Sequence, residues 1–394
     1  MINLVDKRMC CGCEACVNSC PQNCISFDFD EEGFGYPNID KNKCIDCGKC
    51  DSVCPMYKHK ERDDDLLLGY IGYAKDKEVQ KEATSGGIFT EIARNVISES
   101  GVAFGAGFAD DFNVAHVACE KTDDLIKLSG SKYVQSRIGD CYKQVAECLE
   151  KGRKVIFCGT PCQVNGLLNC VGYNDRLYTI DLVCRAVPSP LVWKEYFDYL
   201  NGQKNGKINR VSFRDKLVGY QFSHFAVYDD NGMVLYKAGT HLDQYLRAFF
   251  SGICNRPSCY ECRFKTIRRL SDITIGDCFW AGEYGIKDKD GVCTIIVHSE
   301  KGKRLLDSAK ICAVEMSVNE LCSRSYELTN STGMDSRRDD FFKDIRNSNI
   351  EEVLNYYFPT TLLKYLRYYI RLFLKVIGVH DVAKSLIVRW RRNR

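Results

Sequence analysis

The feature that most constrains this chain is a cysteine pattern that occurs twice before residue 56. Each copy spaces four cysteines by two, two and three residues and closes with a proline. The first copy contains Cys10, Cys13, Cys16 and Cys20, and the second contains Cys44, Cys47, Cys50 and Cys54. Three thiolates on one tight loop can hold three irons of a cubane, while the fourth, displaced along the chain, reaches a second cluster. The pattern therefore predicts two 4Fe-4S clusters and single-electron chemistry.

The stretch between the quartets, ISFDFDEEGFGYPNID, alternates around a glycine-bearing turn and predicts a β-hairpin. The whole segment resembles a bacterial dicluster ferredoxin, an α+β fold. That resemblance implies that Cys10, Cys13, Cys16 and Cys54 hold one cluster, and that Cys44, Cys47, Cys50 and Cys20 hold the other. Zinc is the alternative, because CxxC pairs also bind zinc tetrahedrally. Cys11 and Cys24 lie outside the quartets and are expected to fill space near the clusters as small apolar side chains.

The composition supports metal binding in a reducing compartment. The chain has 24 cysteines among 394 residues, and its N-terminal MINLVDKRMCC lacks the apolar core of a signal peptide. Disulfide-rich proteins are mostly small and secreted, so we expect a cytoplasmic protein whose cysteines bind metal. The net charge of +3 predicts no general affinity for nucleic acid. The chain contains no run of about 18 consecutive apolar residues, so we predict no membrane span.

The sequence divides into three expected regions: a dicluster ferredoxin domain at 1–65, an α/β domain at 66–333 and a basic helical tail at 334–394. KVIFC and LYTIDLVC predict buried strands, and SGGIFTEIARNVISES and IGDCYKQVAECLEKG predict amphipathic helices. VSFRDKLVGYQFSHFAVYDDNGMVLYKAG predicts an antiparallel extension that turns at DDNG. GVAFGAGF is apolar throughout and opens no clear helix, so it is discounted as a dinucleotide-binding fingerprint.

Three short stretches of the middle region are candidates for binding a cofactor. Ser85, Gly86 and Gly87 precede a predicted helix and would present backbone N–H groups to an anion, although such a stretch can also be a simple helix cap. Lys132 and Tyr133 follow Ser131 on a predicted loop. The third stretch is the strand-to-helix turn Gly159-Thr160-Pro161-Cys162-Gln163, in which Cys162 lies at a helix N-terminus that stabilises a thiolate.

A second group of cysteines predicts a further metal site. Cys254, Cys259 and Cys262 are close in sequence, and Cys184 at the end of a predicted strand could supply a fourth thiolate. Cys162 and Cys278 compete with them as ligands.

These stretches together resemble the flavin-containing beta subunits of deazaflavin-dependent hydrogenases and dehydrogenases. The motifs are SGG-x2-T, SKY, GTPCQ, VCRAVPSP, FRDK-x2-GY, SCYEC and SDITIGD, in that order over about residues 70–300. The resemblance implies FAD and a third 4Fe-4S cluster. It also implies that Ser85, Gly86, Gly87 and Thr90 contact the FAD, with Lys132, Tyr133 and the 159–163 turn nearby. Where relatives often have His-Gly, this chain has Arg185-Ala186, and a guanidinium could hold an anionic substrate but cannot exchange protons near neutral pH.

The expected function is an iron–sulfur flavoprotein oxidoreductase that passes electrons between ferredoxin or another carrier and a small organic substrate, as in polysaccharide or other metabolite biosynthesis. Lys132, Tyr133 and Cys162 are the candidate catalytic proton donors. The alternatives are a non-catalytic electron-input subunit of a larger redox complex, a deazaflavin coenzyme dehydrogenase and a zinc-stabilised interaction protein.

The C-terminal region carries a basic, amphipathic pattern. From Tyr356 onward there are nine Lys or Arg residues against one acid, Asp381. Lys364, Arg367, Arg371 and Lys375 recur at helical spacing, with leucine, isoleucine and aromatic residues on the opposite side. This pattern predicts either an interfacial helix on the anionic inner face of a membrane or a helix packed on its own domain with its basic face in water.

Overall fold

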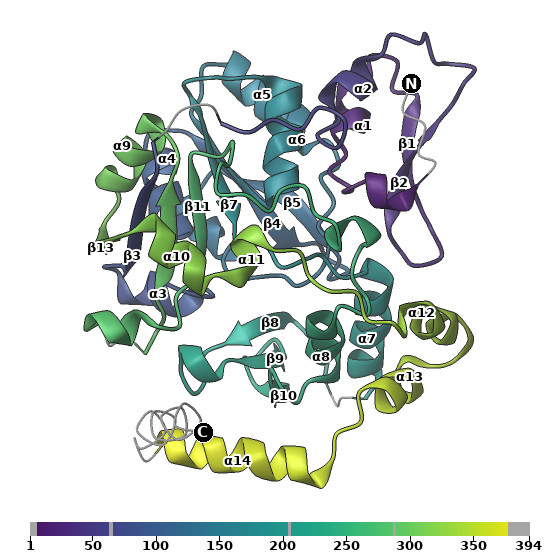
Figure 1. Cartoon of the computed structure of the whole chain (residues 1–394), viewed down its shortest axis with the longest axis vertical. Helices are drawn as coiled ribbons and strands as arrows, with labels where there is room; N and C mark the ends of the chain where they lie inside the picture. The colour runs from purple at the N-terminus through teal and green to yellow at the C-terminus, as the bar shows by residue number, and fades with distance from the viewer. Residues whose placement is uncertain (1–5, 63–65, 204–205, 287–288, 377–394) are drawn as a thin grey trace.

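The computed structural model describes residues 6–62, 66–203, 206–286 and 289–376. Its centre is a mixed sheet of eight strands in the order β13-β3-β12-β11-β7-β6-β4-β5 (Figure 1). Neighbouring strands β4, β6, β7 and β11 run parallel, and the outer pairs are antiparallel. The strands are β3 (Leu68–Ala74), β4 (Val102–Phe108), β5 (Val114–Cys119), β6 (Val155–Gly159), β7 (Leu177–Leu182), β11 (Ile273–Asp277), β12 (Cys293–Val297) and β13 (Ile311–Met316).

Helices cover both faces of this sheet. The apolar faces of α4 (Ile88–Ser98) and α9 (Glu300–Ser308) pack on one side, over Ile156, Ile180 and Ile295. On the other side α5 (Cys141–Glu150) and α6 (Pro161–Val171) pack over β4 and β6. Because these central strands are buried on both faces, they are continuous apolar runs rather than alternating ones. The expected strands KVIFC and LYTIDLVC are confirmed as β6 and β7, the two expected helices as α4 and α5, and GVAFGAGF forms β4.

The N-terminal domain packs on the outer side of α6. It contains the expected hairpin, β1 (Ile25–Phe29) and β2 (Gly35–Ile39), with two short helices, α1 (Ala15–Ser19) and α2 (Lys49–Val53). Cys11, Cys13 and Met56 share a buried apolar cluster with Val164 and Leu167 of α6. The domain therefore continues the core of the middle region instead of standing apart from it (Figure 1).

The antiparallel extension forms a second core. Strands β8 (Arg210–Asp215), β9 (His224–Tyr228) and β10 (Val234–Gly239) form a three-stranded sheet, which is the expected antiparallel extension. Trp193 is buried at the centre, among Phe213, Phe225 and Tyr245. The helices that surround this core are α7 (Pro190–Gly202), α8 (Gln244–Ser251), α12 (Arg338–Asn347) and α13 (Ile350–Tyr357).

The C-terminal region is helical, as expected, but its first part is not a tail. Phe341, Phe342, Val353 and Leu354 are buried in the core that α7 and α8 share. Only α14 (Leu362–Val376) lies on the outside of the molecule (Figure 1). The expected basic segment after residue 376 lies outside the described residues.

The remaining elements are short. They are η1 (Lys7–Met9), α3 (Lys77–Glu82), η2 (Thr122–Lys127), η3 (Tyr220–Phe222), η4 (Pro257–Cys259), η5 (Ala281–Tyr284), α10 (Val318–Arg324) and α11 (Tyr326–Thr329). Within the described ranges, no helix combines the length and the apolar character needed to cross a membrane.

Candidate functional site

The parallel strands bring the candidate residues to one edge of the large sheet. Strands β6, β7 and β11 end at Gly159, Leu182 and Asp277 and are neighbours in the sheet. Because parallel strands share the direction of their carboxyl ends, the segments that follow them meet at the same edge, where α/β folds commonly bind ligands. Cys162 and Cys184 follow two of these strands, and Asp277 closes the third.

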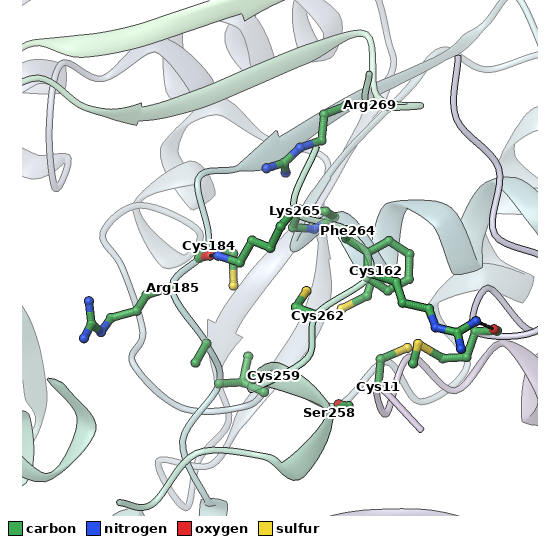
Figure 2. A pocket seen from close by; sticks show the side chains of 15 residues that line it. Cys11, Cys162, Cys184, Arg185, Ser258, Cys259, Cys262, Phe264, Lys265 and Arg269 are labelled. Carbon is green, nitrogen blue, oxygen red and sulfur yellow. Dashed lines mark hydrogen bonds between the residues drawn. The ribbon is translucent and has the colours of Figure 1, made fainter. Parts of the chain in front are cut away.

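Four cysteines of the middle region line one pocket at this edge, Cys162, Cys184, Cys259 and Cys262, and Cys11 of the N-terminal domain lines it as well. Figure 2 shows the sulfur atoms of Cys162, Cys184 and Cys262 facing the same space. Cys162 is placed by the start of α6, where Thr160 and Gln163 form a reciprocal capping box and Pro161 occupies the first turn. Cys259 ends η4, and the N–H of Cys262 donates to Ser331 Oγ at 2.9 Å.

Burial and mutual proximity raise the pKa values of these thiols. Burial raises the pKa of Cys184 to about 12, and the neighbouring sulfurs of Cys162 and Cys262 add to the effect. Burial also raises the pKa of Cys259 far above its ordinary value, and Cys184 and Cys262 reinforce this shift. A group of thiols that resists ionisation becomes a thiolate group only when metal cations replace its protons. Buried thiols are a donor type that suits a metal cluster, but within the described residues no three Cys, His, Asp or Glu side chains lie close enough together to hold a single metal ion.

The structure places one member of the expected third ligand group apart from the others. Cys254 is fully buried beside Tyr245 and Phe249 in the core of the antiparallel extension and does not line the pocket. Cys162, which the sequence left as a competitor, occupies the fourth position. Cys278, the other competitor, is buried against Ile71 and Ala281 in a separate cluster. Sequence proximity to Cys259 was therefore misleading.

Arg185 points away from the thiol pocket (Figure 2). Its guanidinium donates to Glu327 at 2.9 Å and to the carbonyl of Phe250 at 2.8 Å. In the expected role Arg185 would hold an anionic substrate, but Glu327 already occupies its guanidinium and would compete with that substrate.

The two N-terminal loops repeat in backbone geometry as well as in sequence. The equivalent positions Gly12 and Asp46 both have positive φ, and so do Glu14 and Gly48. Left-handed residues within such tight loops turn successive N–H groups toward one point, as in many Fe–S sites.

The hairpin and the loops bring cysteines of the two quartets near one another. Cys20 lines one pocket with Cys44, Cys47 and Cys50. Burial raises the pKa values of Cys16 and of Cys54, which comes from the second quartet. The charge of Cys10 adds to both shifts, and the charge of Cys54 adds to that of Cys16, so these three cysteines lie near one another. Cys13 lies next to Cys16 and contacts the α6 backbone at Gly166, where its Sγ would be 3.1 Å from an added Cβ.

Cys11 lies between the first quartet and the thiol pocket. Its thiol is buried and interacts with those of Cys13 and Cys162. It is therefore a small buried side chain at the contact between two cysteine groups. Cys24 is likewise buried, with its Sγ 3.4 Å from that of Cys20. Both positions match the expectation of fillers near the quartets.

A fully buried arginine fixes the N-terminal domain on the rest of the chain. Arg256 donates to the carbonyls of Cys10 at 2.7 Å and Gly35 at 2.9 Å, and to Gln135 Oε1 at 3.0 Å. Its guanidinium also lies 4.5 Å from the ring centre of Tyr36. The hydrogen bonds place the loop of the first quartet directly against the segment that carries Cys259.

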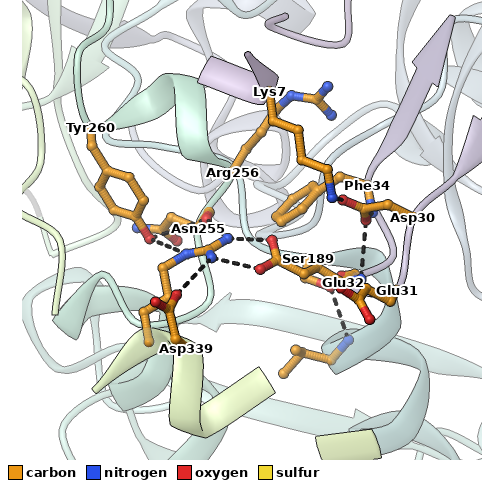
Figure 3. A network of polar contacts seen from close by, with 12 residues as sticks. Lys7, Asp30, Glu31, Glu32, Phe34, Ser189, Asn255, Arg256, Tyr260 and Asp339 are labelled. Atoms are coloured by element: carbon orange, nitrogen blue, oxygen red, sulfur yellow. Dashed lines mark hydrogen bonds and ion pairs between the residues drawn. The ribbon is translucent and has the colours of Figure 1, made fainter. Parts of the chain in front are cut away.

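Carboxylates of the N-terminal domain complete the contact. Glu32 forms a two-point pair with Arg338 at 2.7 and 2.5 Å, within the polar network of Figure 3. Glu14 is buried and accepts from Arg137 at 2.9 Å and from the N–H of Ile138 at 2.9 Å. Because these charged groups are paired with good geometry, the position of the domain is well defined.

A polar group gathers next to the thiol pocket, at the same edge of the sheet. Arg214 donates to Tyr133 Oη and to Asp277 Oδ2, both at 3.2 Å. Ser85 Oγ donates to the carbonyl of Val292 at 2.6 Å and lies 3.4 Å from Tyr220 Oη. The expected SGG and SKY stretches are thus brought together, and Thr84 links them because its Oγ1 lies 3.0 Å from Ser131 Oγ.

Close packing is a sufficient reason for glycine at several positions around this polar group. A Cβ on Gly86 would lie 2.6 Å from the carbonyl oxygen of Gly72, and the Gly86 N–H donates to Cys293 Sγ. Gly87 has φ of 79° as the N-cap of α4. Thr90, in the first turn of α4, is half-buried. At the strand-to-helix turn of residues 159–163, a Cβ added to Gly159 would lie 2.9 Å from the ring of Phe157.

Comparison with family models finds similarity in two parts of the chain. Residues 152–319 match a family model that describes the C-terminal part of the beta chain of coenzyme F420 hydrogenase/dehydrogenase. This match covers less than half of the chain. Two models described as 4Fe-4S dicluster domains match residues 9–57 and 36–88. Both matches confirm the resemblances drawn from the motifs, and they support a redox role for the chain.

Other comparisons are more distant. A chain in a solved structure of the F420-reducing NiFe hydrogenase complex from Methanosarcina barkeri is similar at 18% identity, with a TM-score of 0.44. The similarity covers 72% of this chain and 93% of that one. No curated protein matches. The family models therefore carry the assignment.

Several residues of the beta-subunit domain have partners that the motifs could not show. Arg214, Lys216, Tyr220 and Asp277 stand in the FRDK-x2-GY and SDITIGD motifs, but the motifs alone suggest no role for them. Lys216 Nζ donates to the carbonyls of Gln80 at 2.7 Å and Ser85 at 2.8 Å. Charged residues inside a family motif that also contains apolar residues are candidates for a buried site. This signal in the sequence could have added these residues to the candidate site.

Lys132 has an unusual titration that can be tested. Its ammonium donates to the carbonyls of Lys127 at 3.0 Å and Ser129 at 2.8 Å, and burial lowers its pKa to about 7. An unfolded lysine keeps its proton up to about pH 10. The unfolded chain thus binds more protons above pH 7, so the free energy of unfolding should rise with pH there.

We expect Lys132→Met to lose this rise, which should be about 1 kcal/mol between pH 7 and pH 8.5 after allowance for partial exposure. Urea unfolding of both proteins at the two pH values measures it. Lys216, whose pKa burial lowers to about 8, contributes with the same sign in both proteins and so cancels in the comparison. Equal pH dependence in both proteins would contradict the assignment.

Proposed function

We propose that this protein is an iron–sulfur flavoprotein oxidoreductase that moves electrons between ferredoxin, or another carrier, and a small organic substrate. It would do so through three 4Fe-4S clusters and FAD. The observation that carries the proposal is the place of the thiol pocket. It is lined by Cys11 and Met56 of the N-terminal domain, and its Cys162 and Cys184 follow strands adjacent to the one that ends at Asp277.

The two N-terminal clusters are proposed on the crossed ligand sets. Cys10, Cys13, Cys16 and Cys54 would hold one cluster, and Cys20, Cys44, Cys47 and Cys50 the other. Supporting this, Cys54 interacts with Cys10 and Cys16, and Cys20 shares a pocket with the second quartet. We propose domains at 1–65, 66–333 and 334–394, as drawn from the sequence, with α12 and α13 packed into the core of the middle region.

The third cluster is proposed on Cys162, Cys184, Cys259 and Cys262. This set replaces Cys254, which lies in the apolar core, and it gives Cys162 a ligand role in place of the proton donor role considered from the sequence. Lys265, whose ammonium donates to the carbonyl of Cys184, is a cation beside the thiol group. A cation at that position would favour the reduced, more negative state of a cluster.

FAD is proposed at the polar group around Arg214, with Ser85, Gly86, Gly87, Thr90, Lys132 and Tyr133 on one side and Gly159, Thr160, Pro161 and Gln163 on the other. When bound, FAD exchanges electrons singly with clusters and in pairs with an organic substrate. The donor set supports an anionic, aromatic cofactor, because it combines the cations Arg214 and Lys216 with the phenols of Tyr133 and Tyr220. Lys132 and Tyr133 remain the proposed proton donors, and the pKa of Lys132, near neutrality, suits that task.

Anaerobic reconstitution tests the proposal. The loaded protein should contain about 12 irons and 12 sulfides per chain for three cubanes. It should also contain one FAD, released by acid and identified by its absorption. Bound zinc, or iron near half that content with no flavin, would overturn it.

The family description favours a second candidate, an electron-input subunit or a dehydrogenase for a deazaflavin coenzyme. The measurement that separates the candidates is turnover by the isolated, reduced protein. Reduction of a deazaflavin would show the dehydrogenase, and reduction of dyes without any organic acceptor would show the electron-input role.

A further inference from the structure

Helix α14 lies alone on the outside of the molecule, below the β8–β10 sheet and at the end opposite the N-terminal domain (Figure 1). One face of the helix is fixed to the protein. Tyr368 Oη bonds His224 Nε2, and its ring packs so closely on the chain that an added Cβ on Gly239 would overlap it. Lys364 Nζ donates to the carbonyl of Pro359 at 2.9 Å. Residues 364 and 368 are four apart and therefore lie one above the other on the same, narrow face of the helix.

The outward face of α14 is apolar and uncovered. Its side chains recur every three or four residues and form one stripe along the helix. The exposed fractions are 85% at Leu362, 55% at Leu366, 58% at Tyr369, 50% at Ile370 and 62% at Phe373. Scattered exposed apolar residues are ordinary, but a contiguous stripe of this kind marks an interaction surface.

The charges of the helix identify the occupant. Arg367 and Arg371 are exposed, and the sequence of α14 contains no acidic residue. Arg371 lies on the side away from the stripe, near His241, where it adds to the effect of burial in lowering the pKa of that imidazole. A second copy of α14 on the stripe would bring together two helices that are both positively charged. An anionic lipid surface instead offers an apolar interior for the stripe and phosphates for the arginines.

The amphipathic character of the helix restricts the mode of binding. The described part of α14 combines the apolar stripe with the exposed cations Arg367 and Arg371, and within the described residues no helix is long and apolar enough to cross a membrane. The helix would therefore lie in the plane of the interface. We propose that the outward face of α14 docks this protein on membranes that contain anionic phospholipid. The N-terminal domain then faces away from the lipid, where a soluble electron carrier can reach it.

The test uses the full-length protein and sedimentation with vesicles of phosphatidylcholine alone or mixed with phosphatidylglycerol. The native chain should bind the mixed vesicles and bind them less as salt increases, because ionic contacts are screened. The variant Leu366→Ser/Ile370→Ser/Phe373→Ser should lose about tenfold or more in partition coefficient. These residues face away from the fold, so its visible spectrum and helix content should not change.

A matched control replaces three exposed apolar residues elsewhere, Leu217→Ser/Met233→Ser/Met334→Ser, and should bind as the native chain does. Arg367→Gln/Arg371→Gln should keep the apolar stripe but lose most of the preference for phosphatidylglycerol. Equal binding by the stripe variant and the native chain would overturn the proposal. So would a native oligomer that the stripe variant converts to a monomer without any change in lipid binding, because the stripe would then be an interface between copies.

Discussion

Replacing Cys162 with alanine should remove one complete cluster from the anaerobically reconstituted protein, about four of 12 irons. Cys162 shares its pocket with Cys184, Cys259 and Cys262, and a cubane that loses one of four thiolates is open to solvent and oxidation. Iron and sulfide analysis, with low-temperature paramagnetic resonance of the reduced protein, measures the loss. The signals of the two N-terminal clusters should remain.

Cys254→Ala is the matched control, because Cys254 is also a buried cysteine and lies five residues before Cys259. It should retain the full iron content and lose only the small packing contribution of a buried sulfur. The reverse result, with iron lost in Cys254→Ala and kept in Cys162→Ala, would restore the ligand set that the sequence favoured. Loss of all iron in Cys162→Ala would instead show that the chain does not fold without the third site.

Replacing Arg256 with glutamine should lower the free energy of unfolding by about 3–5 kcal/mol. The buried guanidinium donates to Cys10, Gly35 and Gln135, and a shorter amide leaves buried carbonyls without partners. The loss should be largest in the N-terminal domain, which Arg256 ties to the segment of Cys259. Urea unfolding of the loaded protein, followed by its visible absorption and by far-ultraviolet circular dichroism, measures both effects.

Arg8→Gln provides the control for charge removal. Arg8 pairs with Asp6 and Glu261 but is more than half exposed, so its replacement should change the free energy of unfolding far less than that of Arg256. A comparable loss in the two variants would mean that Arg256 acts only as a surface charge. Two separate transitions in the Arg256 variant, with the visible bands lost first, would show that the N-terminal domain has been released.

The cysteine quartets could be predicted from sequence because their ligands are local. A C-x2-C-x2-C-x3-C-P repeat places three thiols on one tight loop whatever the rest of the chain does. The strands β6 and β7 were equally predictable, since Val155 to Phe157 and Leu177 to Ile180 are short apolar runs bounded by turns. The family motifs then identified the middle region, and the family model confirmed them.

The third cysteine group could not be predicted in full because its members come from distant segments. Cys254 stands nearer in sequence to Cys259 and Cys262 than Cys162 does, yet α8 and η4 turn it into the core beside Tyr245. The same holds for Arg256 and Glu32, whose partners lie 246 and 306 residues away. The basic pattern around α14 left open whether its apolar side faces the protein or the outside, and the contact of Tyr368 with His224 decides this.

The sequence by itself determined the metal chemistry of the N-terminal domain, the family of the beta-subunit segment and the elements of the central sheet, because each depends on residues close together in the chain. Only the tertiary structure decided which four thiols share the inner pocket, how Arg256 joins that pocket to the first quartet and which side of α14 remains uncovered. These features depend on where strands and helices end relative to one another, and local residue preferences do not specify that.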